Sequence, residues 1–315
     1  MSGSYSGFAR RLFQGYRSGP ITLGHSLLRR ALAAGLATRQ EVRLRSGLRL
    51  QLDLSKGSQS TIFWLDGNIE VQLYWAIREL LPLAGVFVDC GANCGLMGLL
   101  ARQYRQARVL FVEPHPRLAK TIEANIQLNG FTETCQLAQC ALSDQDGEVD
   151  FYENLSRDGA HSIHKDWAGG MREFGKVKCA TLAGLLAEHA LTKVHFLKVD
   201  TEGNDLAVLR GAGSWLRPQA IELIYVEMSR DRELIRALLE ANGYVGFVNT
   251  LKNQREVAKR RREYERGGRA CFFTPLRAGP DRDQQQQGEV LWCPKGSEVE
   301  ACLRELAQTD RDARQ

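Results

Sequence analysis

The sequence predicts an α/β protein built on a mostly parallel, doubly wound sheet. Apolar runs of strand length alternate with segments of helical periodicity over most of the chain, and such alternation is typical of a parallel sheet covered by helices on both faces. The chain has 315 residues, of which 43% are hydrophobic and 25% are charged. This length and composition suit one sizeable globular core with extensions at its ends.

The predicted elements follow one another in a regular order. Residues 41–54 predict a small antiparallel pair of strands. The main strands are expected at 86–90, 108–113, 134–140, 194–200, 221–227, 243–249 and 290–293. The helices are expected at 69–81, 96–105, 116–129, 181–190, 204–211 and 230–242. Glycines at positions 130, 211 and 243 mark helix ends, because glycine readily adopts the left-handed conformation that ends a helix.

Residues 145–180 interrupt this alternation. They contain an extended segment at 148–152 and a glycine-rich loop at 159–170. Long loops beside the ends of a sheet often carry function. We therefore expect a substrate lid between the third and fourth main strands.

Residues 86–95 (VFVDCGANCG) are the most informative part of the chain. An apolar strand is followed at its end by Asp89 and a glycine-containing loop. The loop contains Gly91, Ala92, Asn93 and Gly95. Glycine lets a ligand approach the backbone closely, and open α/β sheets bind ligands at the carboxyl ends of their strands. We expect this loop to form the floor of a nucleoside site, in which Asp89 either fixes the loop or receives an ammonium group.

The next strand ends in Glu113 and is followed by Pro114. An ionised carboxylate accepts hydrogen bonds through two oxygens, so Glu113 can hold both hydroxyls of a ribose. Acidic surroundings also favour a cationic sulfonium ligand. Two consecutive strands that end in carboxylates, with glycines after the first, therefore fit the S-adenosylmethionine site of a methyltransferase.

Two other functions are alternatives. An NAD(P)-dependent Rossmann oxidoreductase also has an acid at the end of its second strand, but its fingerprint is G-x-G-x-x-G. Here the spacing is G-x-x-x-G, and the preceding Asp89 would repel a pyrophosphate. The second alternative is a non-catalytic, methyltransferase-like scaffold. Loss of Asp89, Glu113 or Asp200 would support it, and all three are present.

Charged residues also end the fourth main strand, in residues 196–203 (FLKVDTEG). Lys198, Asp200 and Glu202 fall at the same sheet edge as the two acids above. Charged side chains at the end of a buried strand need partners. One explanation is a structural ion pair between Lys198 and Asp200 or Glu202. The other is that these residues face the transferred methyl group and act in the reaction.

A hydroxyl acceptor must lose a proton during methyl transfer. Asp200 and two histidines of the 159–170 loop, His161 and His164, are the candidate bases. A divalent ion held by Asp200, Glu202 or Glu227 could instead acidify the acceptor. We do not expect a metal site. A divalent ion is kept only as the alternative to a side-chain base.

Together these segments resemble the FkbM family of methyltransferases. The resemblance covers roughly residues 60–250 and is carried by DGNIE at 66–70, VFVDCGANCG at 86–95, FVE at 111–113, ALSD at 141–144, FLKVDTEG at 196–203, LRG at 209–211 and IYVE at 224–227. It implies a class I Rossmann-like methyltransferase fold and S-adenosylmethionine as the methyl donor. It also implies O-methylation of a hydroxyl on a sugar, a polyketide or another small metabolite.

The resemblance implies roles for single residues. The donor loop would be shaped by Asp89, Gly91, Asn93 and Gly95, and the ribose would be held by Glu113. The adenine would be bordered by Ser143 and Asp144. The reacting centre would be faced by Lys198, Asp200, Glu202 and Gly203. The chain departs from the family pattern at Cys94, where a branched aliphatic residue is usual, and at Gly98, where Ser or Thr is common.

The formal net charge is +5, and two segments carry this excess of positive charge. Residues 1–40 contain six arginines and no acid, which suits a transit peptide, an arm on an anionic membrane or a surface helix. Residues 251–270 contain eight basic and three acidic residues, and the interspersed glutamates favour a solvated helix or lid. We expect a small-molecule acceptor and no nucleic-acid partner, with peripheral membrane contact through the N-terminus as an option.

The expected organisation has three regions. They are a basic extension with the antiparallel strands (1–60), the methyltransferase domain (61–250), and a region with a basic helix, a polar loop and a C-terminal strand and helix (251–315). The eight cysteines form no C-x-x-C pair or zinc-type block. We expect a reducing, cytoplasmic location, and the sequence contains no secretory signal and no apolar run long enough to span a membrane.

Overall fold

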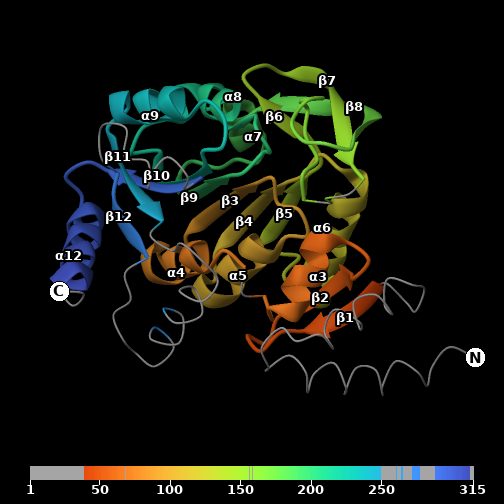
Figure 1. Cartoon of the computed structure of the whole chain (residues 1–315), viewed down its shortest axis with the longest axis horizontal. Coiled ribbons are helices and arrows are strands. Elements are labelled where there is room, and N and C mark those ends of the chain that lie inside the picture. Colours follow the sequence, from red (N-terminus) through yellow and green to blue (C-terminus); the bar gives the residue numbers. More distant parts are fainter. Residues whose placement is uncertain are drawn as a thin grey trace, which may run out of the picture.

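A central eight-stranded sheet organises the chain, with helices on both of its faces (Figure 1). The computed structural model describes residues 39–67, 69–155, 157, 159–249, 260, 264, 272–276 and 288–312. The spatial order of the strands is β12-β11-β13-β10-β9-β3-β4-β5. In chain order they are β3 (Val86–Cys90), β4 (Arg108–Val112), β5 (Cys135–Ala138), β9 (Val194–Val199), β10 (Ile221–Glu227), β11 (Tyr244–Asn249), β12 (Phe273–Pro275) and β13 (Glu289–Pro294).

The sheet is mostly parallel, which confirms the predicted fold class. β3 pairs in parallel with β4 on one side and with β9 on the other, and β4–β5 and β9–β10 are also parallel. β13 lies antiparallel between β10 and β11, and β12 is antiparallel to β11. The strand order reverses between β3 and β9. A ligand site is therefore expected at the carboxyl ends of these two strands.

Helices cover the sheet in two layers (Figure 1). One face is covered by α4 (Val71–Leu80), α5 (Leu96–Arg105) and α6 (Pro116–Leu128), and the other by α7 (Leu182–Glu188), α8 (Asp205–Gly211) and α9 (Arg232–Ala241). Side chains alternate between the faces of a strand, so Phe87 enters one core and Val88 the other. All six helices agree with the sequence prediction to within two residues at either end.

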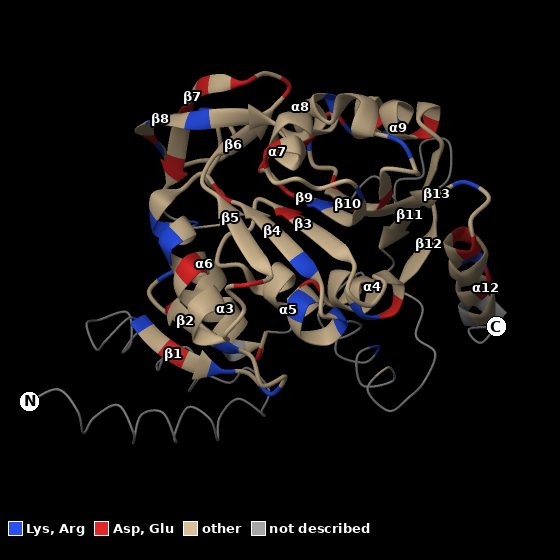
Figure 2. Ribbon diagram, turned by 180° about the vertical axis from the view of Figure 1, so that it is seen from behind, with Lys and Arg blue, Asp and Glu red and all other residues tan. Residues whose placement is uncertain are grey.

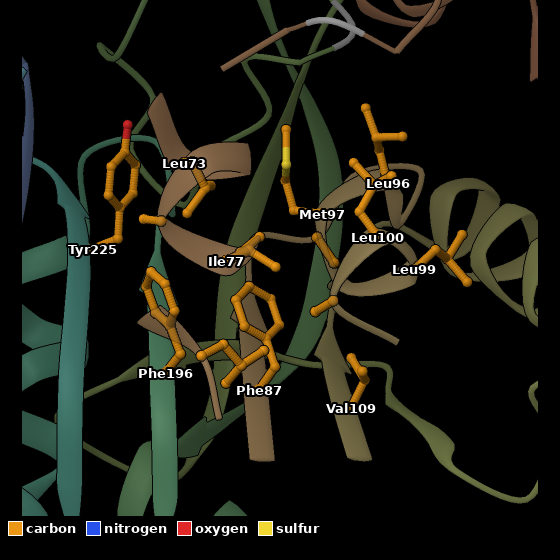
Figure 3. Packing of buried hydrophobic residues seen from close by; sticks show 14 of the residues in the cluster. Leu73, Ile77, Phe87, Leu96, Met97, Leu99, Leu100, Val109, Phe196 and Tyr225 are labelled. Carbon is orange, nitrogen blue, oxygen red and sulfur yellow. The ribbon is translucent and has the colours of Figure 1, made fainter. Parts of the chain in front are cut away.

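The core beside α4 and α5 fixes the start of α4 at the sheet edge. Leu73 and Ile77 of α4 lie above the rings of Phe87 and Phe196, whose centroids are 5.4 Å apart (Figure 3). Both rings are fully buried. Because burial of one large apolar side chain stabilises a fold by roughly 1.5–3 kcal/mol, α4 is firmly held on the sheet. The residue before it, Glu70, is held with it.

The predicted antiparallel pair is present as β1 (Arg39–Arg43) and β2 (Arg49–Asp53). It packs beside α6, where Asn125 Oδ1 accepts a hydrogen bond from the Gln51 N–H at 2.6 Å. The buried Asn125 also donates to the Cys94 carbonyl at 3.0 Å. This side chain thus ties the strand pair to the loop after β3. The sequence did not predict helix α3 (Gly57–Trp64), which follows β2 and has no apolar face of helical periodicity.

Residues 141–181 contribute a second sheet with three strands in the order β6-β8-β7. The strands are β6 (Ala141–Ser143), β7 (Gly147–Asn154) and β8 (Met171–Thr181). The sequence predicted only the extended segment within β7. β8 was missed because most of its residues are exposed and polar, so that no apolar run marks it.

The main sheet includes residues beyond position 250, where we expected the central domain to end. β13 is an interior strand, and α12 (Glu298–Asp312) packs against β12 and β13. Residues 1–38 and nearly all of the basic segment 251–270 lie outside the described residues, so their expected roles stay predictions. Over the described ranges, no helix combines the length and the apolar character that crossing a membrane would need.

Candidate active site

A cavity of about 240 Å³ opens at the carboxyl ends of β3, β4 and β9. Its wall includes the loop after β3, residues after β4 and β9, part of α3 and the loop between β7 and β8. Figure 2 shows red, acidic ribbon near the ends of β3 and β9. The cavity thus lies where the strand order reverses. We call the part around β3 and β4 the donor half and the part at the end of β9 the acceptor half.

The glycine loop after β3 brings the two halves together. Gly91 has φ of 76°, and a Cβ atom there would lie 1.8 Å from the Asp200 carbonyl oxygen. Only glycine allows this close approach of two backbone segments. Gly95 and Asn93 also have positive φ, and Ala92 lines the cavity beside them. The predicted floor of the site is therefore formed by backbone.

Asp89 fixes the start of α5. Its Oδ2 accepts a hydrogen bond from the Gly98 N–H at 3.0 Å, and its side chain is 1% exposed. Burial raises the pKa of Asp89, while nearby Lys198 opposes the shift. The glycine at position 98, a departure from the family pattern, has a steric reason: a Cβ atom there would lie 2.2 Å from the Phe111 ring.

Glu113 points into the cavity, as its expected ribose role requires. Its Oε2 accepts a hydrogen bond from the Asn93 N–H and its Oε1 accepts one from the His115 N–H, both at 2.9 Å. Each oxygen keeps a lone pair for a further donor. Burial raises the pKa of Glu113 to about 7, although the two backbone hydrogen bonds oppose this shift. Pro114 lines the cavity next to it.

Lys198 joins the donor half to the acceptor half. Its Nζ donates to Asp200 Oδ2 at 2.9 Å and to the Gly91 carbonyl at 3.3 Å, and lies 3.6 Å from Asp89 Oδ1. Burial disfavours the charged amine, but Asp200 and Asp89 outweigh it and raise the pKa of Lys198 well above its usual value. Burial also opposes ionisation of Asp200, yet Lys198 lowers the pKa of Asp200 below its usual value. The structural ion pair considered from the sequence is present, and both partners line the cavity.

Two further carboxylates meet Asp200 in the acceptor half. Burial raises the pKa of Glu227 to about 10, and its carboxyl group donates a hydrogen bond to Asp200. Glu202 Oε2 accepts a hydrogen bond from Trp167 Nε1 at 2.6 Å, and burial, together with the charge of Asp200, raises the pKa of Glu202 to about 7. Oxygens of the three carboxylates lie within 4.8 Å of one another. Oxygens this close also suit a divalent ion, and calorimetric titration with Mg²⁺ tests that alternative.

The two histidines proposed as bases do not fit that role. His161 lines the cavity, but its Nδ1 accepts a hydrogen bond from the Asn154 N–H at 3.0 Å. The remaining proton of the neutral ring therefore sits on Nε2, and no lone pair is free. Burial, and to a smaller extent the neighbouring His115, lower the pKa of His161 to about 4. The two rings are stacked, with their centroids 4.6 Å apart. His164 lies outside the cavity wall.

The expected adenine contacts also need correction. Neither Ser143 nor Asp144 lines the cavity; the residues just before them, Cys140, Ala141 and Leu142, do. The backbone at Ser143 turns away to pack on α8, where a Cβ atom on Gly211 would lie 2.2 Å from the Ser143 carbonyl oxygen. In this chain the segment 141–144 therefore serves at Ser143 to pack β6 against α8.

Several cavity residues were missed from the sequence. Ser58, Ile62, Ile69 and Glu70 reach the cavity from the segment before β3, and Ser162 and Ile163 reach it from the loop after β7. In the sequence, Ile69 and Glu70 belong to the segment 66–70 that resembles the FkbM family, whereas no motif marks Ser58 or Ile62. The second group carries no motif, so only the folded structure reveals it.

The chain is similar to known methyltransferases. Residues 89–245 match the model of the methyltransferase FkbM domain. Methyltransferase sdnD of Sordaria araneosa is 29% identical over 52% of this chain and 75% of its own length. Methyltransferase 1 of Beauveria bassiana (strain ARSEF 2860) is 30% identical over 53% of this chain and 75% of its own length. Among solved structures, the METTL16 methyltransferase domain is 11% identical, with a TM-score of 0.46 over 93% of this chain and 92% of that one.

The matched residues begin at Asp89 and include Glu113 and the β9 signature, so the family match covers most of the cavity wall. The wall residues before β3 lie outside the match. It does not support the NAD(P)-dependent oxidoreductase or the scaffold. The cavity also fits S-adenosylmethionine: Gly91 admits a ligand against the backbone, and Glu113 offers acceptors to a ribose. The chain therefore belongs to the FkbM family of S-adenosylmethionine-dependent methyltransferases.

Proposed function

We propose that this methyltransferase O-methylates a hydroxyl group of a neutral small metabolite, such as a sugar or a polyketide. The observation that carries the proposal is a pair of carboxylates, Asp200 and Glu202, in the cavity wall after β9. A hydroxyl acceptor must lose its proton during methyl transfer. A carboxylate beside it can take that proton.

The donor half positions S-adenosylmethionine, which supplies an electrophilic methyl group on a sulfonium when it is bound. Glu113 accepts hydrogen bonds from the ribose hydroxyls, and Gly91 lets the ligand lie against the backbone. Ile62 of α3 and Ile163 of the loop after β7 close the cavity with apolar surface, which helps to exclude water. Alignment of the two reactants supplies a large part of the rate of such a displacement.

Glu202 is the better base of the pair. Its pKa of about 7 lies near a usual working pH, where a general base is most effective. Asp200 is held ionised by Lys198 and accepts a hydrogen bond from Glu227. We assign proton removal to Glu202 and orientation of the acceptor hydroxyl to Asp200.

The charge of the acceptor half supports a neutral acceptor. Lys198 is the only Lys or Arg among the described residues that line the cavity, and it is already paired with Asp200 and Asp89. A phosphate-rich acceptor such as a nucleic acid would therefore face uncompensated carboxylates. A hydroxylated metabolite faces no such repulsion and finds several hydrogen-bond acceptors.

Incubation with methyl-labelled donor and a panel of hydroxylated metabolites tests the proposal. NMR spectroscopy of the product shows whether the methyl group is on oxygen. We expect Glu202→Gln to lower turnover by about 10²–10⁴-fold and to leave donor affinity unchanged. Glu123→Gln on the exposed face of α6 is the matched control with normal turnover. Methylation of nitrogen or carbon, or full activity of Glu202→Gln, would contradict this assignment.

A further inference from the structure

Glu70 faces the cavity in an unusual backbone conformation. It immediately precedes α4, with φ of 47° and ψ of 51°, which is the left-handed region that favours glycine. Its Oε2 atom is buried and has no hydrogen-bond partner, although the residue lines the cavity. Strained residues of this kind persist where the surrounding structure holds them, often at ligand sites. A buried carboxylate oxygen without a donor is costly unless a ligand supplies one.

The charges near Glu70 leave room for one more cation. The cation that acts on it is Lys198, whose Nζ is already bonded to Asp200 at 2.9 Å and lies 3.6 Å from Asp89. The Asp89 Oδ1 atom is also buried and accepts no hydrogen bond. Glu70 and Asp89 thus each present a buried oxygen that accepts no hydrogen bond. Lys198 supplies positive charge to both carboxylates.

The position of Glu113 gives the direction in which the donor lies. Glu113 marks the ribose, and the cavity wall includes apolar side chains, among them Leu142 and Phe151, that suit the adenine. The amino-acid part of the donor therefore extends the other way, past the glycine loop toward Asp89 and Glu70. That part carries an α-ammonium group. We infer that Glu70, together with Asp89, binds the α-ammonium group of S-adenosylmethionine.

A role for Glu70 toward the acceptor is less well supported. The carboxylates assigned to the acceptor, Asp200 and Glu202, follow β9, whereas Glu70 comes from the segment before α4. An ammonium group donates three hydrogen bonds and carries the charge that this part of the cavity lacks. A neutral hydroxyl would satisfy one oxygen and leave the charges unbalanced.

Isothermal titration calorimetry with three ligands tests the inference. S-adenosylmethionine and S-adenosylhomocysteine carry the α-ammonium group, whereas 5′-methylthioadenosine lacks the amino-acid part. Glu70→Gln keeps the shape of the side chain and removes its charge. We expect it to weaken binding of the first two ligands about tenfold to hundredfold and to leave the third unchanged.

Glu289→Gln is the matched control. Glu289 also contributes to the electrostatics of Glu70, but it is hydrogen-bonded to Gln72 at 3.0 Å and to Asn249 at 2.9 Å and lies outside the cavity wall. We expect it to bind all three ligands normally. Unchanged binding of S-adenosylhomocysteine by Glu70→Gln would overturn the inference. An equal loss for 5′-methylthioadenosine, or a loss confined to S-adenosylmethionine, would overturn it as well, because these results place Glu70 at the adenosine or at the sulfonium.

A measurement on the wild-type protein keeps the inference testable if Glu70→Gln does not fold. Burial raises the pKa of Glu70 to about 8, so the free protein holds a proton there. The titratable groups that face it are Asp89, Lys198, Asp200, Tyr225 and Glu289. At a pH of about 6.5, below the usual pKa of an α-amino group, an arriving ammonium displaces this proton. Titrations in buffers of different ionisation enthalpy should show more proton release with S-adenosylhomocysteine than with 5′-methylthioadenosine, and equal release would refute the role of Glu70.

Discussion

Glu113 and Asp89 of the donor half accept hydrogen bonds from backbone N–H groups, whereas Asp200 and Glu202 of the acceptor half accept them from other side chains. Glu113 is fixed by two backbone donors and Asp89 by the Gly98 N–H. Asp200 and Glu202 depend instead on side chains, notably Lys198 and the Trp167 indole. Backbone donors are held by the fold itself, whereas side-chain donors such as Lys198 and Trp167 depend on their rotamers. The positions of Glu113 and Asp89 are therefore fixed by the backbone, whereas those of Asp200 and Glu202 depend on the side chains around them.

Gly91→Ala should have the largest effect, because this residue belongs to both halves. A methyl group would collide with the Asp200 carbonyl at 1.8 Å, and the backbone has φ of 76°. We expect a loss of roughly 4 kcal/mol or more in the free energy of unfolding, measured by denaturant titration. Gly169→Ala is the control: a Cβ atom there has no neighbour within 4 Å, and its effect should stay within about 0.5 kcal/mol. Similar stabilities of the two variants would show that the halves can separate.

The pH profile of turnover should report on the acceptor half alone. A base must be unprotonated, and the pKa of Glu202 is about 7. With saturating donor, turnover should therefore rise with pH and level off above about 7, and fall about tenfold per pH unit below it. Initial rates from pH 5 to 9 check this expectation. A profile that stays flat down to pH 5 would exclude Glu202 as the base.

Glu113→Ala should change the donor half without altering that profile. It removes charged hydrogen bonds to the ribose, so donor binding should weaken by about 1–3 kcal/mol, as measured by calorimetry. Glu123→Ala, on the exposed surface of α6, is the control with normal affinity. Normal affinity of Glu113→Ala itself would end the ribose assignment.

Trp167→Phe should have the smallest effect and sharpens the comparison. It keeps an aromatic ring over Gly203 but removes the hydrogen bond to Glu202. That hydrogen bond lowers the pKa of Glu202, so its loss should move the midpoint of the turnover profile upward by less than about one pH unit. The affinity for the donor should not change. A shift to lower pH would mean that Trp167 does not donate to this carboxylate.

The sequence predicted the strand-end carboxylates of both halves for one physical reason. Asp89 and Glu113 are recognisable because each ends an apolar strand, and parallel strands bring their carboxyl ends to one edge. Their partners are backbone groups close in sequence. Gly91 is likewise required by the close approach of the Asp200 carbonyl.

The remaining site depends on contacts between residues far apart in the chain. Trp167 reaches Glu202 from the loop after β7, and Glu70 reaches the cavity from the start of α4. His161 looked like a base because it titrates near neutral pH when free, but Asn154 occupies its lone pair in the fold. No periodicity or spacing encodes such contacts, so only their positions in space identify them.

β13 has a consequence for how this enzyme is made. It is synthesised after β10 and β11, yet it lies between them. Until residues 289–294 leave the ribosome, these two strands have no common neighbour and keep open edges, which invite pairing with other chains. Glu289 at the start of β13 then bonds Gln72 of α4, two residues from Glu70. β10 and β11 therefore gain their shared neighbour only after residues 289–294 have been synthesised.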